Sequence, residues 1–106
     1  MSEVRVVAVE GDVDMSRAPA LRDELRRSVS NHDIGLVVDL SRTTYLDSAG
    51  VNTLFEVAEE LRDRQLGFAV VVPDGSLVER VITLVDLAAA AGIHRTVDDA
   101  RRALEP

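Results

Sequence analysis

The residues with the clearest chemical potential lie in one short stretch, Tyr45-Leu46-Asp47-Ser48-Ala49-Gly50-Val51. An apolar run over 36–40 and a polar turn over 41–44 precede it, and a helical pattern follows it. Asp47 and Ser48 therefore stand where a loop enters a helix, and a helix start leaves several backbone N–H groups without intrahelical partners. One of these side chains can cap the helix, which leaves the other for binding or modification.

Two assignments of the cap are possible. If Ser48 caps the helix, its hydroxyl oxygen is committed to a backbone N–H. If Asp47 is the cap, Leu46 and Val51 occupy the two positions whose apolar contact forms a hydrophobic staple. Only the second assignment uses both apolar residues. We therefore predict that Asp47 caps the helix and that the Ser48 hydroxyl is exposed and free.

The sequence offers no general base that could activate Ser48 as a nucleophile. A serine nucleophile needs a general base, normally a histidine, within hydrogen-bond reach. The chain has no Gly-x-Ser-x-Gly motif and no glycine-rich phosphate loop, and His32 and His94 lack the spacing of metal ligands. The absence of cysteine removes thiolate chemistry and cysteine-type zinc sites. We expect no enzyme activity, no cofactor and no metal site.

Three carboxylates could gather near Ser48. Asp12 and Asp14 belong to the turn-like segment Glu10-Gly11-Asp12-Val13-Asp14, and Asp47 adjoins the serine. Carboxylates of this kind could hold Mg²⁺, as in phosphate-transfer receiver domains. Receiver domains also need a phosphorylatable aspartate and a lysine, and this chain contains no lysine. A receiver-type site is therefore not expected.

Hydrophobic periodicity predicts the elements that position these residues. Near-continuous apolar runs predict buried strands near 4–10, 35–40 and 67–72. Apolar residues at three- and four-residue steps predict helices near 17–30, 48–64, 77–90 and 97–104. Ser16 is the expected cap of the first helix, and Ser76 with Glu79 forms a capping box for the third. Residues around Ile93 could form a very short edge strand.

The alternation of strands and helices is typical of an open, mostly parallel α/β sheet, here with three to five strands and about four helices. Parallel strands carry the loops that follow them on one edge of the sheet, where ligands and partners bind. Three loops should therefore meet at that edge, namely 12–16, 45–48 and 73–76. The first two bring Asp12, Asp14, Asp47 and Ser48 together.

Length and charge indicate a single domain that does not bind nucleic acid. The 106 residues suit a single domain over 1–106, with a core of Val, Leu, Ile and Ala because aromatic residues make up only 3%. The net charge is −7, and the twelve basic residues are scattered arginines, which argues against nucleic-acid binding. A basic protein partner suits an acidic surface. No apolar run approaches a membrane span and no signal sequence is visible, so we expect no membrane association and a cytoplasmic location.

Two motifs carry a resemblance to a known family. The segment Leu46-Asp47-Ser48-Ala49-Gly50-Val51 follows a strand that ends in Val37-Val38-Asp39-Leu40, and Gly11-Asp12-Val13-Asp14 is followed by Ala18-Pro19-Ala20-Leu21. With these motifs and their spacing, the chain resembles STAS domains from about Val4 to Leu104. A stand-alone domain with Asp-Ser-x-Gly is most similar to the anti-sigma factor antagonists of that family.

This resemblance implies a function and a set of site residues. Such antagonists bind an anti-sigma factor, typically also a serine kinase, and so free a sigma factor. The kinase phosphorylates the serine that matches Ser48, which ends the interaction, and a serine phosphatase restores it. The resemblance makes Ser48 the expected phosphorylation site. It also implies a partner-binding surface made of Asp12, Asp14, Asp47, Ser48, Ala49, Gly50 and Val51.

Other roles within the family stay open at this stage. STAS domains also serve as accessory subunits of lipid transporters and as scaffolds in stress-signalling complexes, and a single sequence does not reveal the partner. The family often has an additional N-terminal strand, which in this chain could comprise only Met1–Val4. The segment Ala88–Ala91 is also longer than the turn usually found there.

Overall fold

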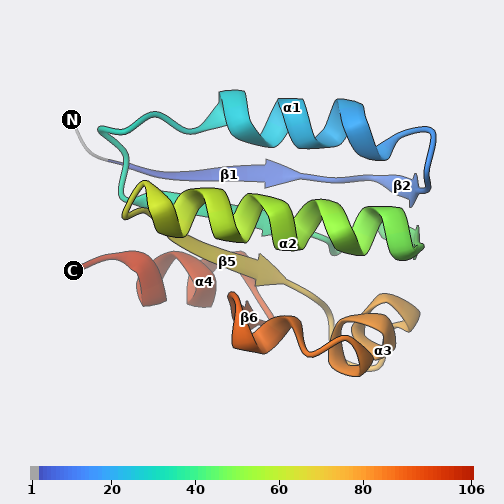
Figure 1. Cartoon of the computed structure of the whole chain (residues 1–106). Coiled ribbons are helices and arrows are strands. Elements are labelled where there is room, and N and C mark those ends of the chain that lie inside the picture. The colour runs from blue at the N-terminus through green and yellow to red at the C-terminus, as the bar shows by residue number, and fades with distance from the viewer. Residues whose placement is uncertain (1–2) are drawn as a thin grey trace.

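A computed structural model describes residues 3–106, which form a parallel sheet covered by helices on both faces (Figure 1). The main sheet has four strands in the order β1-β3-β5-β6, and β2 and β4 form a second sheet of two strands. The strands are β1 (Val4–Ala8), β2 (Gly11–Val13), β3 (Gly35–Asp39), β4 (Thr43–Leu46), β5 (Gly67–Val71) and β6 (Gly92–His94). The helices are α1 (Ala18–Ser28), α2 (Ser48–Asp63), α3 (Leu77–Leu84) and α4 (Val97–Leu104), with a short 3-10 turn, η1, at Leu87–Ala89.

The predicted α/β architecture is confirmed. All strand pairs are parallel, with Val4 opposite Gly35 in β1 and β3, and Gly35 opposite Gly67 in β3 and β5. The short edge strand near Ile93 forms as β6 and pairs with β5. The further strand considered for Met1–Val4 falls partly outside the described residues, because Met1 and Ser2 are not described.

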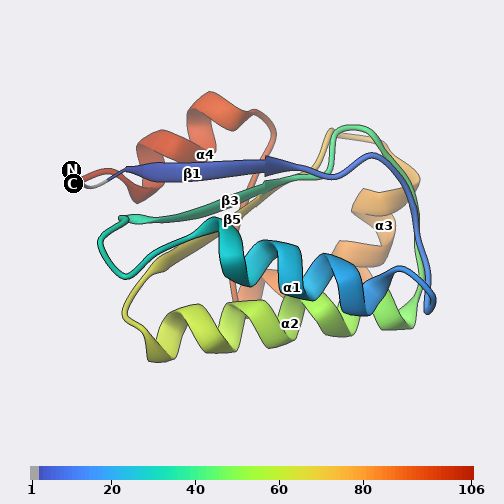
Figure 2. The same cartoon turned by 90° about the horizontal axis from the view of Figure 1, so that it is seen from above.

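The sheet separates two apolar layers. Helices α1 and α2 pack on one face of the sheet and α4 packs on the other (Figure 2). The larger layer contains the inward faces of α1 and α2, with buried Leu25, Leu54 and Leu61, and it also receives Leu87. The smaller layer lies under α4 and contains Val37, Val71 and Ala100, among others. Because both faces are covered, the central strands β3 and β5 are buried, continuous apolar runs. The prediction that the first strand is also buried is wrong for most of β1, because β1 lies at the edge of the sheet.

Two segments predicted as turns are strands. Gly11–Val13 and Thr43–Leu46 pair in parallel, with Asp12 opposite Tyr45 and Val13 opposite Leu46. The Thr43 hydroxyl donates to the carbonyl of Val9 at 2.7 Å, which anchors the start of β4 to the end of β1. Each segment is short and polar, so neither shows a strand pattern alone. Their pairing depends on residues about 30 positions apart, which local periodicity does not reveal.

The third helix is shorter than the predicted 77–90. It ends at Leu84, and Asp86 adopts a left-handed backbone conformation with φ of 55° before the 3-10 turn. A continued helix would carry Leu87 round to the side of exposed Leu77 and Arg80, whereas the observed turn buries Leu87 completely. Burial of a leucine side chain contributes about 1.5–3 kcal/mol, which offsets the strain at Asp86, a residue type that adopts the left-handed conformation more readily than most.

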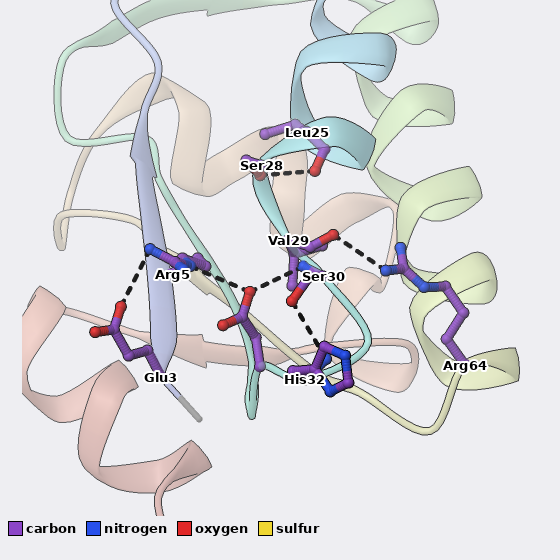
Figure 3. Close-up of polar contacts among 9 residues, drawn as sticks. Glu3, Arg5, Leu25, Ser28, Val29, Ser30, His32 and Arg64 are labelled. Atoms are coloured by element: carbon purple, nitrogen blue, oxygen red, sulfur yellow. Dashed lines mark hydrogen bonds and ion pairs between the residues drawn. The ribbon is translucent and has the colours of Figure 1, made fainter. Parts of the chain in front are cut away.

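The turn between α1 and β3 is held by side chains from distant elements (Figure 3). Buried Asp33 accepts hydrogen bonds from the Ser30 N–H at 2.8 Å and from Arg5 Nε at 3.1 Å. On its other side, Arg64 of the α2 C-cap donates to the Val29 carbonyl at 3.1 Å. The Ser30 N–H holds the pKa of Asp33 below its ordinary value, with Arg5 adding to the effect. The turn therefore fixes the far ends of α1 and α2.

Candidate functional site

Asp47 caps α2, as the sequence predicts. Its backbone is extended, and its carboxylate accepts a hydrogen bond from the Gly50 N–H at 3.0 Å. Leu46 and Val51, the residues expected to form the hydrophobic staple, are both buried. The chain therefore enters the helix in a fixed direction, with the first helical position occupied by Ser48.

Ser48 is exposed at this first helical position. Among residues 3–106, no hydrogen bond involves its hydroxyl, because the capping role belongs to Asp47. The site is the N-terminus of a helix of 16 residues, where the helix dipole favours negative charge. The hydroxyl is thus free to react with, or bind to, a group that approaches from solvent.

Gly50 allows α2 to approach the small sheet closely. A Cβ at this position would lie 2.5 Å from Leu46 Cδ1 and 3.1 Å from the carbonyl oxygen of Val13. The N–H of Asp47 also donates to that carbonyl of Val13, at 3.2 Å. The helix start is therefore packed directly on β2 and β4, and any larger residue at position 50 would push it away.

The small sheet brings Asp12 to the same region. Asp12 lies opposite Tyr45 in the register of β2 and β4, and its carboxylate accepts a hydrogen bond from the Thr44 hydroxyl at 2.5 Å. Both residues are exposed. Thr44 thus holds an acidic side chain on the strand that leads directly into Asp47 and Ser48. The predicted meeting of the first two loops occurs, but it is made by two strands.

Asp14 caps the turn that leads into α1, a role that the sequence assigns to Ser16. Its Oδ1 accepts hydrogen bonds from the Ser16 N–H at 3.1 Å, the Ser16 hydroxyl at 2.7 Å and the Arg17 N–H at 3.2 Å. These bonds, led by that of the Ser16 hydroxyl, hold the pKa of Asp14 below its ordinary value. Arg17 is the N-cap residue and has no side-chain capping bond. The prediction that Ser16 caps the helix is therefore wrong, because its hydroxyl donates to Asp14 instead of accepting from an N–H of α1.

Arg17 is a structural residue of the site that the sequence analysis does not single out. Its guanidinium donates to the carbonyl oxygens of Glu10 and Asp12, the latter at 3.0 Å, and so holds β2 against the start of α1. Gly11 lies beneath it with a positive φ of 79°. An arginine six residues after a turn glycine is too weak a signal to indicate this contact.

Exposed apolar side chains line two grooves beside the elements that carry Ser48. Tyr45 is 53% exposed and Leu77 is 71% exposed, and both line a groove of about 270 Å³ between β4 and α3. On the other side of α2, Met15 is 75% exposed and lines a groove of about 250 Å³ with Ala49 and Asn52. Large exposed apolar residues around one point are typical of a protein-binding surface. The third predicted loop contributes to this surface through α3, the helix that follows it.

The structure places the expected surface residues in two groups. Asp12, Asp14 and Ser48 are exposed, and Asp47 and Ala49 are partly exposed. Gly50 and Val51 are buried beneath them, so they do not present side chains to solvent. Asp12, Asp14 and Asp47 do not form a metal-binding cluster. Residues 3–106 contain no group of three or more potential ligands that could hold a metal ion. The arrangement is a shallow acidic and apolar surface around a free hydroxyl.

The chain is similar to known proteins in sequence and in structure. The chain is 31% identical over 97 residues to the anti-sigma-F factor antagonist RsfB of Mycobacterium tuberculosis (strain H37Rv), covering 92% of this chain and 78% of RsfB. An anti-sigma factor antagonist from Mycobacterium paratuberculosis superimposes with a TM-score of 0.84 at 36% identity, covering 95% of this chain and 85% of that one.

A more distant structure shares the fold. The Bacillus cell fate determinant SpoIIAA in its phosphorylated form has a TM-score of 0.67 at 18% identity, covering 99% of this chain and 94% of that one. Within residues 3–106, no helix combines the length and apolar composition that a bilayer crossing requires. The family model described as STAS domain matches residues 2–100, and the chain therefore belongs to the STAS domain family.

Proposed function

We propose that this chain is a phosphorylation-switched anti-sigma factor antagonist. It binds an anti-sigma factor that is also a serine kinase, and this binding releases a sigma factor. The kinase then phosphorylates Ser48 and ends the interaction, and a serine phosphatase restores it. The observation that carries the proposal is the free, exposed hydroxyl of Ser48 beside a cap that Asp47 alone provides. The names of the two mycobacterial relatives support the antagonist role.

The fold tolerates a phosphate at this position. A phosphoserine carries about −1.5 to −2 charges at pH 7. At Ser48 these charges meet the positive end of the α2 dipole and the free N–H groups of its first turn. Since no hydrogen bond of the described fold depends on the Ser48 hydroxyl, its modification removes none. The phosphorylated protein should therefore stay folded.

The same phosphate should weaken the binding of a partner. It joins a surface that already carries Asp47 and Asp12, so the local negative charge rises steeply. A partner that packs over Ser48 must remove water from this charge, which costs several kcal/mol unless basic groups compensate it. Steric and electrostatic exclusion suffices, and no conformational change of the antagonist is needed.

The proposed contact surface combines charge with apolar anchors. We propose that Asp12, Asp14 and Ala49 join Asp47 and Ser48 in this surface, and that exposed Tyr45, Leu77 and Met15 extend it on both sides of α2. Gly50 and Val51 contribute by fixing the start of α2 rather than by touching the partner. A few buried side chains, most often Tyr, Trp or Arg, supply most of the energy of a protein interface, while charges set orientation and association rate. We propose a binding role without catalysis, and a cytoplasmic location.

One experiment tests this function directly. The tagged chain is used to capture its partner from the native cell, and the partner's affinity is measured before and after addition of ATP. Wild type should take up one phosphate and lose binding, while Ser48→Ala should bind and stay bound. Ser41→Ala, a change at another exposed serine, should behave as wild type. Capture of a transporter ATPase instead of an anti-sigma kinase would reject the proposal and assign the accessory role in lipid transport.

A further inference from the structure

Strand β1 is an open edge of the main sheet. It has β3 on one side and no strand on the other among residues 3–106, and with five residues it is longer than the opposite edge strand, β6. The carbonyl of Glu3 accepts from the Ile34 N–H at 2.7 Å, and the Val9 N–H donates to the Asp39 carbonyl at 2.9 Å. The odd-numbered residues of β1 thus direct their backbone groups towards β3.

The even-numbered residues point the other way. Backbone groups along a strand alternate in direction, so the N–H and C=O groups of Val4, Val6 and Ala8 point away from the sheet. Natural edge strands are usually protected by proline, a bulge or inward-pointing charge. Val4, Val6 and Ala8 carry none of these devices, and Val6 is 39% exposed. The one charged residue of the strand, Arg5, is already paired with Glu3 and Asp33. The edge is therefore a template for another strand.

The surface beside this edge is electrically balanced. An open groove of about 650 Å³ lies between β1 and the end of α4, with apolar Val4, Val6 and Ile34 in its lining. Its charged side chains are two acids and two bases, namely Glu3, Glu105, Arg5 and Arg101. Glu3 and Arg5 are already paired at 3.1 Å (Figure 3). In a chain of net charge −7, this is a surface where two copies can meet without strong repulsion.

We propose that β1 pairs antiparallel with β1 of a second copy and forms a two-fold symmetric dimer. The two-fold axis passes between Val6 and Val6 of the second copy, and Val4 lies opposite Ala8. These are the residues whose backbone groups point outward, so each pair exchanges two hydrogen bonds. Such an interface is isologous, because the same strand serves both copies. The exposed Val6 side chains meet at its centre.

The dimer leaves the Ser48 site free. That site is built by β2, β4 and α2 at the carboxyl ends of the strands, whereas the new contact involves the outer edge of β1. One dimer thus presents two Ser48 surfaces, which would increase the apparent affinity for a dimeric partner. Dimerisation does not depend on the proposed function and is tested without any partner.

Charge substitution at the axis tests the dimer. Sedimentation equilibrium of wild type should show a monomer–dimer equilibrium, and Val6→Arg should weaken it about tenfold or more, because like charges then face each other. Val6→Glu should do the same, but a mixture of the two variants should form a heterodimer. Val6→Thr should dimerise like wild type. Circular dichroism shows that each variant is folded. A wild type that remains monomeric at every soluble concentration would overturn the proposal, as would a dimer that persists in Val6→Arg.

A cysteine at the axis gives a second, independent readout. The chain has no cysteine, so Val6→Cys introduces a single thiol. Hydrogen-bonded antiparallel pairs place Cα atoms about 5.5 Å apart, which suits a disulfide. Val6→Cys should therefore form a covalent dimer under mild oxidation much faster than Leu84→Cys, although Leu84 is the more exposed residue. Equal rates for the two variants would contradict pairing at β1.

Discussion

The starts of α2 and α3 use the same kinds of residue in different positions. At α3, Ser76 is the cap, and its hydroxyl accepts from the Glu79 N–H at 3.1 Å and donates to the Pro73 carbonyl at 2.9 Å. At α2, Asp47 is the cap, and the serine follows it with a free hydroxyl. One helix thus uses its serine for stability, and the other leaves its serine available for chemistry.

The third helical residue differs as well. At α3 this residue is Glu79, whose carboxylate reaches back to accept from the Gly75 N–H at 2.8 Å, one residue further upstream than in the predicted capping box. At α2 it is Gly50, whose lack of a side chain allows contact with Val13 and Leu46. The comparison teaches that Ser48 keeps a free hydroxyl because a separate residue caps α2, while the close packing of Gly50 fixes the start of that helix.

The largest expected effect is a loss of partner binding when a negative charge is placed at the start of α2 rather than at the start of α3. Ser48→Asp places a carboxylate within the proposed contact surface, and removing water from an uncompensated charge costs several kcal/mol. We expect the dissociation constant for the proposed anti-sigma factor partner to rise about a hundredfold, or about 3 kcal/mol. Ser76→Asp adds the same charge at the cap of α3, next to Leu77 at the rim of the proposed surface and where Asp caps as well as Ser, so its dissociation constant should rise much less than that of Ser48→Asp. Calorimetric titration measures both. Equal binding by Ser48→Asp and Ser48→Ala would show that local charge is not the mechanism.

The next effect concerns packing at α2. Gly50→Ala forces a Cβ against Leu46 and Val13, and overpacking of this kind typically costs about 1–3 kcal/mol. Urea unfolding should therefore show a lower midpoint for this variant. Asn52→Ala, a change at an exposed position of the same helix, should remain within about 0.5 kcal/mol of wild type. An unchanged midpoint for Gly50→Ala would mean that the helix start is less tightly packed than its geometry indicates.

A smaller effect compares the capping residues. Asp47→Ala and Ser76→Ala should each reduce the free energy of unfolding by about 1 kcal/mol, because each removes a cap. Ser48→Ala should change it by no more than about 0.5 kcal/mol. Thermal unfolding followed by circular dichroism distinguishes these outcomes. A loss for Ser48→Ala that matches the loss for Asp47→Ala would show that the hydroxyl contributes to capping.

The smallest effect is a change in the pH dependence of stability. The hydrogen bond from the Gly75 N–H holds the pKa of Glu79 below its ordinary value, with Arg95 adding to the effect. A folded pKa below the unfolded one stabilises the protein above the unfolded value of about 4.3, and this stability is lost as the pH falls through the folded pKa. Glu79→Gln should therefore flatten the fall in stability below that pH. An identical acid profile for the variant, measured by urea unfolding, would contradict this contribution.

Local sequence patterns predicted most of the helices and strands, and they also predicted that Asp47 rather than Ser48 caps α2. The apolar runs of β3 and β5 and the helical period of α2 are strong because burial imposes them directly on the sequence. The choice of Asp47 over Ser48 as the cap was also readable, since the staple residues Leu46 and Val51 flank it at fixed distances. These signals all lie within a few residues of the feature they predict.

Long-range contacts decided the rest. The segments that form β2 and β4 are short and show no strand pattern of their own. Only their pairing brings Asp12 to the strand that leads into Ser48. Likewise, the need to bury Leu87 ended α3 early, although the local alanines favour a longer helix. The exposure of Tyr45 and Leu77 depends on which faces the neighbouring elements cover. The sequence alone therefore determined the free serine and its cap, whereas only the tertiary structure decided which side chains surround it, because packing between distant segments leaves no periodic pattern in either one.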